Sequence, residues 1–221
     1  MVRDQEVVGS NPIHPTLNFS LPIGYDCMTI IDDVLNDIFG KAQKRPAVSD
    51  GPIMETIAGR RATRNFLKDE VPKEALDKII EAMRLAPSAG NLQSRFFYFV
   101  RNAEKRAQLA KAAHDQRHVA EAPVCIVACT DERISQKYGQ HGVDVYSLID
   151  VAAAVENGML MAHSLGLGTC WVGSVDETEV RKTLDIPNHL RPVSLIPLGY
   201  PASRPRMPAR KGTKDIAQIV D

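Results

Sequence analysis

A long apolar segment in the second half of the chain constrains the fold more than any other feature. Residues 145–165 have helical spacing and are apolar on almost every side, so this helix lies either in the core or against a partner chain. The run from Leu148 to Leu167 is a poor membrane span, because four polar or charged residues interrupt it, among them Asp150 and His163. We therefore expect a buried helix, with His163 as a core residue, and no membrane association.

The other elements predict an α+β fold in which helices flank a small sheet. Apolar runs typical of strands are few and irregularly spaced, which argues against a doubly wound parallel sheet. The polar segment 131–144 contains two glycines and is expected to be a mobile loop. Expected helices cover 29–39, 52–59, 71–85, 103–113 and 177–184, and expected strands cover 96–100, 123–129 and 192–198.

Charge and cysteine content exclude several classes of partner. The 221 residues include 27 Lys and Arg against 27 Asp and Glu, so no overall charge favours nucleic acid or anionic lipid. The four cysteines show neither CxxC nor Cys/His spacing. We expect no metal site, and reduced cysteines in a cytoplasmic protein.

The first 27 residues are set apart from the rest. Residues 1–16 show no periodicity, and we hypothesise that translation begins at Met28 and that segment 1–27 is a spurious extension. The alternative is a genuine arm without fixed structure. In either case we expect 28–221 to form a single domain.

Three arginines lie within five positions where the helix 52–59 ends. Arg60, Arg61 and Arg64 are followed by a loop of small residues at 86–93. Guanidinium groups make charge-assisted, bidentate contacts with phosphate, and exposed backbone N–H groups suit a flat polar ring. The pattern thus predicts a phosphate-bearing cofactor. The alternative is a solvated basic helix end that complements the helix dipole.

A second glycine-rich segment, Gly-Leu-Gly-Thr-Cys-Trp-Val-Gly, occupies 166–173. It is not a dinucleotide fingerprint, because its glycines are spaced GxGxxxxG and it follows a helix instead of opening one after a strand. The alternative to a binding role is a glycine that caps a helix, followed by a buried Trp171.

Together, the segments 60–66, 86–93 and 165–173 resemble the FMN-dependent nitroreductase family. The end of the last strand, Gly199-Tyr200-Pro201 with a basic tail, is a weaker fourth match. The resemblance covers the chain from about Pro52 to its end. It implies a small, mostly antiparallel sheet flanked by helices, in an intertwined homodimer whose C-terminal tails cross between subunits and whose cofactor is FMN.

The resemblance also implies roles for individual residues. Arg60 and Arg64 would hold the FMN phosphate and ribityl chain, and the N–H of Gly173 would face flavin N5. The loop at 86–93 would approach FMN, often from the other subunit. The residues expected to bind the cofactor are Arg60, Arg61, Arg64, Pro87, Ser88, Asn91, Gln93, Trp171, Val172, Gly173, Ser174, Arg210 and Lys211.

The sequence departs from the family pattern at three places. Ala62 replaces the usual serine of the arginine segment, and Ser94-Arg95 replaces a Pro-Trp pair after the loop. The family's amide and lysine before the second strand correspond to 115–118. There, Arg117 or His118 would stabilise reduced, anionic FMN.

The implied activity is ping-pong electron transfer from NADH or NADPH through FMN to flat, electron-poor acceptors such as nitroaromatics or quinones. No catalytic side chain is expected, because the reactivity belongs to the flavin. Segment 131–144, with Tyr138 and His141, and Tyr146 just after it, would face the substrate. The alternatives are a specialised flavin enzyme of the same family (dehalogenation, heterocycle dehydrogenation or flavin fragmentation) and a non-catalytic FMN-binding protein.

Overall fold

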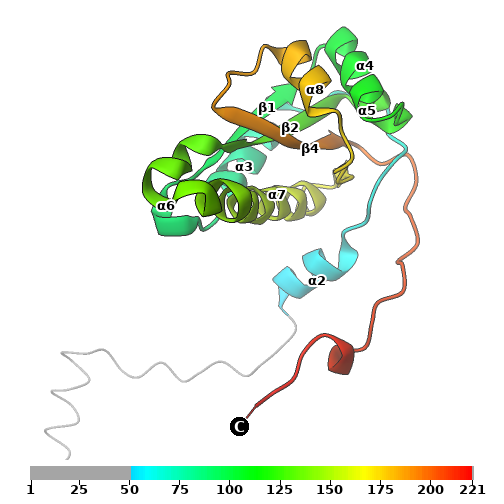
Figure 1. Cartoon of the computed structure of the whole chain (residues 1–221). Helices are drawn as coiled ribbons and strands as arrows, with labels where there is room; N and C mark the ends of the chain where they lie inside the picture. The colour runs from blue at the N-terminus through cyan, green and yellow to red at the C-terminus, as the bar shows by residue number, and fades with distance from the viewer. Residues whose placement is uncertain (1–50, 221) are drawn as a thin grey trace, which may run out of the picture. The chain divides into compact units, whose positions relative to one another are not determined.

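A four-stranded antiparallel sheet in the order β1-β2-β4-β3 forms the centre of the computed structural model (Figure 1). Its strands are β1 (Arg95–Val100), β2 (Val124–Asp131), β3 (Gly168–Thr169) and β4 (Leu190–Gly199). The structure describes residues 51–220. The segment 1–27, the proposed start at Met28 and the helix predicted at 29–39 lie outside these residues.

Side chains of β2 alternate between two apolar clusters, one on each face of the sheet. Ile126 and Ala128 belong to one cluster, and Val127 and Cys129 to the other. Because both faces are covered, the strand is apolar without a break, unlike a strand with one face in water. The prediction of an α+β fold, with a small antiparallel sheet flanked by helices, is confirmed.

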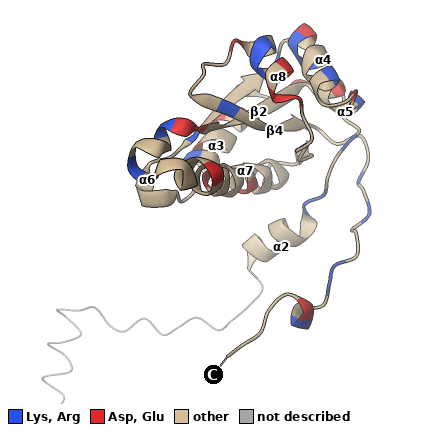
Figure 2. Cartoon of the chain, in the orientation of Figure 1, with Lys and Arg blue, Asp and Glu red and all other residues tan. Residues whose placement is uncertain are grey.

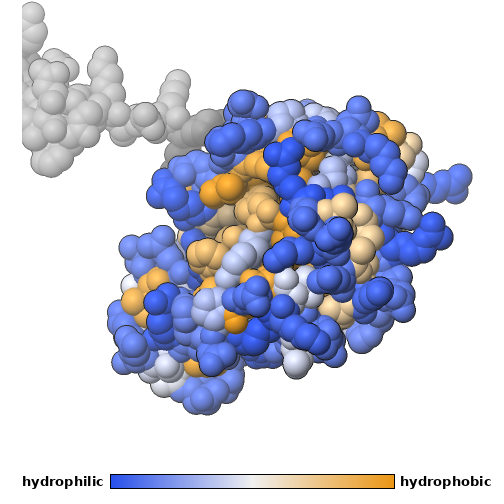
Figure 3. Space-filling model, turned by 90° about the horizontal axis from the view of Figure 1, so that it is seen from above, coloured by the Kyte–Doolittle hydropathy of each residue, from blue (hydrophilic) through white to orange (hydrophobic). Residues whose placement is uncertain are grey.

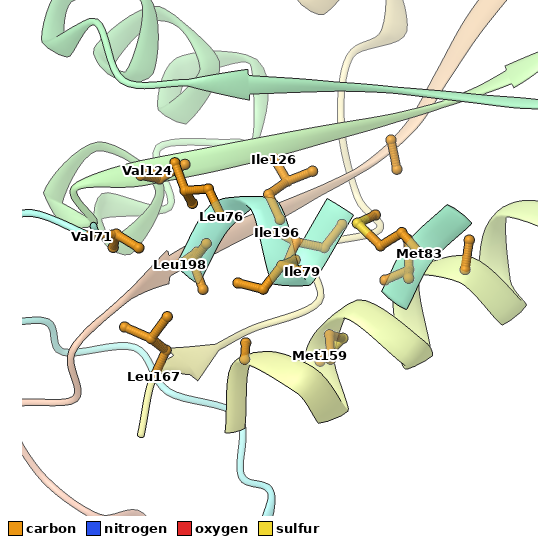
Figure 4. Packing of buried hydrophobic residues seen from close by; sticks show 14 of the residues in the cluster. Val71, Leu76, Ile79, Met83, Val124, Ile126, Met159, Leu167, Ile196 and Leu198 are labelled. Carbon is orange, nitrogen blue, oxygen red and sulfur yellow. The ribbon is translucent and has the colours of Figure 1, made fainter. Parts of the chain in front are cut away.

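One face of the sheet is covered by α3 (Lys73–Arg84) and α7 (Ser147–Ser164). Figure 4 shows Ile79 and Met83 of α3 packed with Met159 of α7 and with strand residues such as Ile196. The two helices approach closely at Gly158, where an added Cβ would lie 2.7 Å from Met83 Cγ. The buried helix predicted at 145–165 is therefore confirmed as α7.

The other face is covered by α4 (Ala103–Ala112), α5 (Arg117–Glu121) and α8 (Glu177–Leu184). The starts of α4 and α8 carry side-chain caps: Asn102 accepts the N–H of Lys105, and Asp176 accepts those of Thr178 and Glu179. Further elements include α2 (Pro52–Gly59) and the short 3-10 turns η1 (Ala89–Asn91) and η4 (Thr213–Asp215).

The prediction of a mobile loop at 131–144 is wrong. This segment forms a 3-10 turn η2 (Glu132–Ile134), helix α6 (Ser135–His141) and a π-helical turn η3 (Gly142–Tyr146), which runs into α7. The N–H of Glu132 donates to His189 O at 2.8 Å, which ties the segment to the rest of the domain, and Gly142 is buried against Tyr138 and Ile134 of the same segment. The rings of Tyr138 and Tyr146 pack edge to face with centroids 5.2 Å apart. These tertiary contacts outweigh the weak helix propensity of its polar residues and glycines.

Among the described residues, one helical stretch, 132–164, is long and apolar enough to cross a membrane. Length and composition are weak grounds for such an assignment, because the core helix of a globular protein passes the same test. Here 44% of the most apolar window is buried inside the protein. Its α7 part packs against α3 and the sheet.

Candidate functional site

The arginine segment is fixed by backbone hydrogen bonds to two parts of the sheet. The N–H of Thr63 donates to Thr169 O of β3 at 2.8 Å, and Ala62 pairs with Thr169 in a parallel bridge. Further along, the N–H of Leu67 donates to Tyr200 O, just after β4, at 2.9 Å. The three arginines therefore extend from an ordered scaffold.

A glycine permits this attachment. Thr63 is only 3% exposed, and its side chain lies against Gly168 of β3. A Cβ at position 168 would be 2.7 Å from Thr63 Cβ, closer than real Cβ atoms pack. Gly168 thus lets the arginine segment lie directly on the sheet, which gives the glycine-rich motif a structural role that the sequence did not reveal.

A basic pocket of about 110 Å³ lies between the arginine segment, the end of α7 and the start of the tail. The basic pocket contains Arg60, Arg61 and Arg204, with His163 beside them. Burial lowers the pKa of His163, and the three guanidinium charges lower this pKa further. Arg60 Nε also lies 3.6 Å from a carboxylate oxygen of Glu156. A pocket with three guanidinium groups and one nearby carboxylate suits an anion. Figure 2 shows basic residues (blue) both after α2 and along the tail.

A buried, orphaned nitrogen belongs to His118, whose pKa the charge of Arg64 affects. Position 118 is 8% exposed, and Nε2 of His118 has no hydrogen-bond partner among the described residues. Burial lowers the pKa of His118, and the charge of Arg64 lowers it further. An unsatisfied buried nitrogen costs about 1–3 kcal/mol, so a ligand that reaches it gains a contact. Arg117, by contrast, is exposed and pairs with Glu121 at 3.1 Å.

The end of the glycine-rich segment carries a free backbone donor. Val172 is paired with Leu195, and each N–H donates to the other's carbonyl at 2.9 Å. The next residue, Gly173, is exposed, and its N–H bonds to nothing within residues 51–220. Trp171 is 41% exposed, so the alternative of a buried tryptophan is wrong. Gly166, with φ of 77°, does cap α7, as that alternative expected.

The loop at 86–94 lies at the opposite end of α7 from the basic pocket. Its Ala89 N–H donates to Asp150 in the first turn of α7, whereas His163 of the basic pocket is in the last turn. The difference, 163 minus 150, is 13 residues, or about 20 Å along a helix. A single chain therefore does not bring Ser88, Asn91 and Gln93 next to the arginines.

In the tail, the structure brings Arg204 to the basic pocket. Arg210 and Lys211 are exposed and make no hydrogen bond or ion pair in the described part of the chain. The sequence places Arg204 in the basic tail expected to contact phosphate, although Arg210 is the preferred residue there. The prediction of His163 as a core residue is wrong, because its side chain is only partly buried and lines the basic pocket.

The two histidines predict a pH-dependent stability of the protein without bound ligand. Both have a pKa below the ordinary 6.5, so the unfolded chain takes up protons first as pH falls. Their stabilising contribution is complete above about pH 6.5 and decreases as pH falls below it. We expect a lower free energy of unfolding at about pH 5.5 than at about pH 7.5 in urea titrations. His118→Phe should reduce this difference, and an unchanged difference would contradict the assignment.

Comparison with known proteins gives consistent matches. Residues 57–120 and 115–200 match the model of the nitroreductase family. A putative NADH dehydrogenase/NAD(P)H nitroreductase of Methanothermobacter thermautotrophicus is 36% identical over 76% of this chain and 84% of its own. An FMN reductase (NADPH) of Bacillus subtilis is 27% identical over 70% of each chain. The structure of NADPH:FMN oxidoreductase from Vibrio harveyi, complexed with NAD⁺, superposes with a TM-score of 0.69 at 26% identity, covering 77% of this chain and 78% of that one.

Proposed function

Because the chain belongs to the nitroreductase family, we propose that it binds FMN and passes electrons from NADH or NADPH to flat, electron-poor acceptors such as nitroaromatics and quinones. The names of its relatives combine a reduced nicotinamide with a flavin or a nitro acceptor. In this chain, the observation that carries the proposal is the basic pocket, with an ordered arginine segment on one side and a glycine-rich segment on the other.

The residues present fit FMN. Guanidinium groups of Arg60 and Arg64 match a dianionic phosphate and the polar chain next to it, whereas the Arg61 guanidinium already donates to Ala58 O and Arg60 O and would lie along the flavin edge. The free N–H of exposed Gly173 and the orphaned Nε2 of His118 are hydrogen-bonding groups without a partner among the described residues. FMN, when bound, supplies the hydride-accepting and electron-transferring chemistry. The protein's own residues bind its phosphate, orient the ring through backbone donors and offer positive charge.

The three cysteines in the described part of the chain are not suited to bind the cofactor or a metal. Cys125, Cys129 and Cys170 are free and buried. Burial raises the pKa of Cys125 and of Cys129 to about 12, so neither thiol is ionised near neutral pH. We assign the cysteines to the core, in a protein of the reducing cytoplasm.

We also propose a homodimer in which the second copy supplies the loop at 86–94. The arginines and the loop lie at opposite ends of α7. The residues expected to contact one FMN therefore do not come together within a single chain. Large apolar side chains are exposed on α2, α7 and the tail, including Ile53 (73%), Ile149 (58%) and Ile219 (88%). Figure 3 shows apolar surface (orange) among hydrophilic residues. A partner chain that covers these side chains would complete the site.

The helical segment 132–146 remains our candidate for the substrate-facing element. It lies over the predicted cofactor loop, because Lys137 Nζ is 2.8 Å from where a Cβ on Gly90 would be, and the Tyr138 hydroxyl is closer still. The rings of His141 and Tyr146 pack next to each other with centroids 4.8 Å apart. An ordered aromatic group beside a flavin site would select flat acceptors.

Purification and anaerobic reduction test the proposed function. The purified protein is expected to be yellow, or to become so on addition of FMN, with one FMN per chain. Excess NADH or NADPH should bleach the flavin absorbance without oxygen, and a quinone or nitroaromatic should restore it. Bound flavin that neither nicotinamide reduces would indicate a passive binding protein. A colourless protein that takes up no FMN would exclude both flavin functions.

A further inference from the structure

A buried carboxylate holds the predicted cofactor loop. Asp150 is 2% exposed in the first turn of α7. Its Oδ1 accepts the N–H of Ala89 at 2.8 Å, and its Oδ2 accepts that of Ser94 at 3.3 Å. No ion pair with Asp150 occurs among the described residues. Burial of an ionised carboxylate is costly unless its oxygens are satisfied, so the side chain strongly favours the loop conformation that supplies both donors.

Arg95 binds carbonyl groups of the same loop and of the end of α3 just before it. Its guanidinium donates to Pro87 O at 3.0 Å, Ala86 O at 2.7 Å and Arg84 O at 3.2 Å. Burial lowers the pKa of Arg95, and the negative charge of Asp150 offsets part of this decrease. Asp150 thus accepts hydrogen bonds from backbone N–H groups of the loop, and Arg95 donates hydrogen bonds to backbone carbonyl groups of the same loop.

The loop needs such support because its backbone is unfavourable. Gly90, Asn91 and Gln93 have φ of 54°, 56° and 53°. Residues other than glycine enter this left-handed region at a cost of about 1 kcal/mol or more each. Such conformations persist only where the surroundings over-determine them, and they concentrate at ligand-binding sites. Here they expose the side chains of Asn91 and Gln93.

We propose that Asp150 is a positioning residue for FMN binding: together with Arg95 it sets the loop at 86–94 in the conformation that completes the FMN site of the partner subunit. This inference rests on the proposed function. Asp150 itself does not touch the cofactor. Substitution of Asp150 disturbs the loop of the same chain. Because that loop completes the partner's site, the substitution weakens FMN binding there and not at the arginines of its own chain.

Asp150→Asn tests the positioning role. The amide keeps the side-chain volume but has one acceptor oxygen, and its NH₂ group would face a backbone N–H. We expect at least a tenfold rise in the FMN Kd, measured by quenching of flavin fluorescence, with little change in the size of the apo-dimer. Ser147→Ala is the matched control, because Ser147 is buried in the same turn of α7 but donates only to Val143 O of the preceding turn η3 and not to the loop. Wild-type affinity in Asp150→Asn would overturn the inference.

A second variant covers the case in which Asp150→Asn does not fold. Ala89→Pro removes one N–H donor from the loop and leaves α7 untouched. The preceding Ser88 is extended, with φ of −151° and ψ of 154°, as a residue before proline prefers. We expect weaker FMN binding again, and unchanged binding would count against the role of this contact.

Mixed dimers test whether the loop acts on the partner's site. Asp150→Asn chains are co-expressed with Arg60→Glu/Arg64→Glu chains, each with a different affinity tag, and the mixed dimer is isolated. One of its two sites then combines wild-type arginines with a wild-type loop, so we expect one tightly bound FMN per dimer. If loop and arginines of one chain served the same site, both sites would be defective and no tight site would form, which would refute the assignment. If wild-type protein bound no FMN at all, the proposed function itself would fail instead.

Discussion

Reversing the charge at Arg60 and Arg64 together is expected to abolish FMN retention and leave the fold and the dimer intact. Both side chains extend from a segment whose backbone bonds to Thr169 and Tyr200 do not involve the guanidinium groups. Each charge-assisted hydrogen bond to phosphate contributes about 1.5–3 kcal/mol. Loss of two such contacts, with added repulsion of the phosphate, should weaken binding by about 3–6 kcal/mol, a factor of at least about 100.

Comparison of FMN with riboflavin makes this test specific for the phosphate. The wild-type protein should bind FMN far more tightly than riboflavin in fluorescence titrations, and the double variant should lose this preference. Arg101→Glu is the control, because Arg101 is exposed, pairs with Glu70 at 3.0 Å and is assigned no contact with FMN. An Arg60→Glu/Arg64→Glu protein that still purified yellow would refute the phosphate assignment.

The same titration decides between the tail residues. The sequence pattern favoured Arg210 and then Lys211, whereas the structure brings Arg204 to the basic pocket. We expect Arg204→Glu to weaken FMN binding as well. A larger loss in Arg210→Glu would instead favour the assignment from the sequence and would imply that the tail moves when the partner chain binds.

Local signals in the sequence were sufficient to predict most of the helices and strands. The predicted bounds of α2 and α8 match the structure because the chain marks these ends chemically, with Pro52 in the first turn of α2 and Asp176 capping α8. The strand predicted at 123–129 was recognisable because both of its faces are buried, which makes it apolar throughout. The segment 131–144 was not recognisable, because packing of Ile134 and the tyrosines, and not local propensity, makes it helical.

The candidate site was only partly predictable, because its contacts are long-range. The arginine and glycine-rich segments, about a hundred residues apart in the chain, were expected to serve one cofactor, and their backbones indeed pair at Ala62 and Thr169. The separation of the loop from the arginines could not be deduced from spacing, since it follows from the length of α7 between them. Likewise, no local pattern indicated that Asp150, a polar residue in an apolar helix, bonds to this loop.

Gly168→Ala is expected to weaken both the attachment of the arginine segment and FMN binding. The added methyl group would lie 2.7 Å from Thr63 Cβ and 2.8 Å from Thr63 Cγ2, so the segment must shift away from β3. Overpacking of this kind costs about 1–3 kcal/mol of stability. Because Arg60, Arg61 and Arg64 move with the segment, we expect a loss of FMN affinity of about tenfold or more. Urea denaturation and FMN titration measure the two effects separately.

Exchanging the large and small residues at positions 63 and 168 shows whether the contact between them causes the losses in Gly168→Ala. Thr63→Gly removes the side chain that the new methyl group would meet, so Thr63→Gly/Gly168→Ala should bind FMN more tightly than Gly168→Ala alone. Thr63→Gly by itself leaves a cavity in the buried contact and should be destabilised. If the pair packs as described, the two substitutions will therefore compensate instead of adding their costs. Strict additivity in both stability and FMN affinity would mean that Gly168 acts through another neighbour, and the close approach of the arginine segment to β3 would no longer explain the glycine at this position.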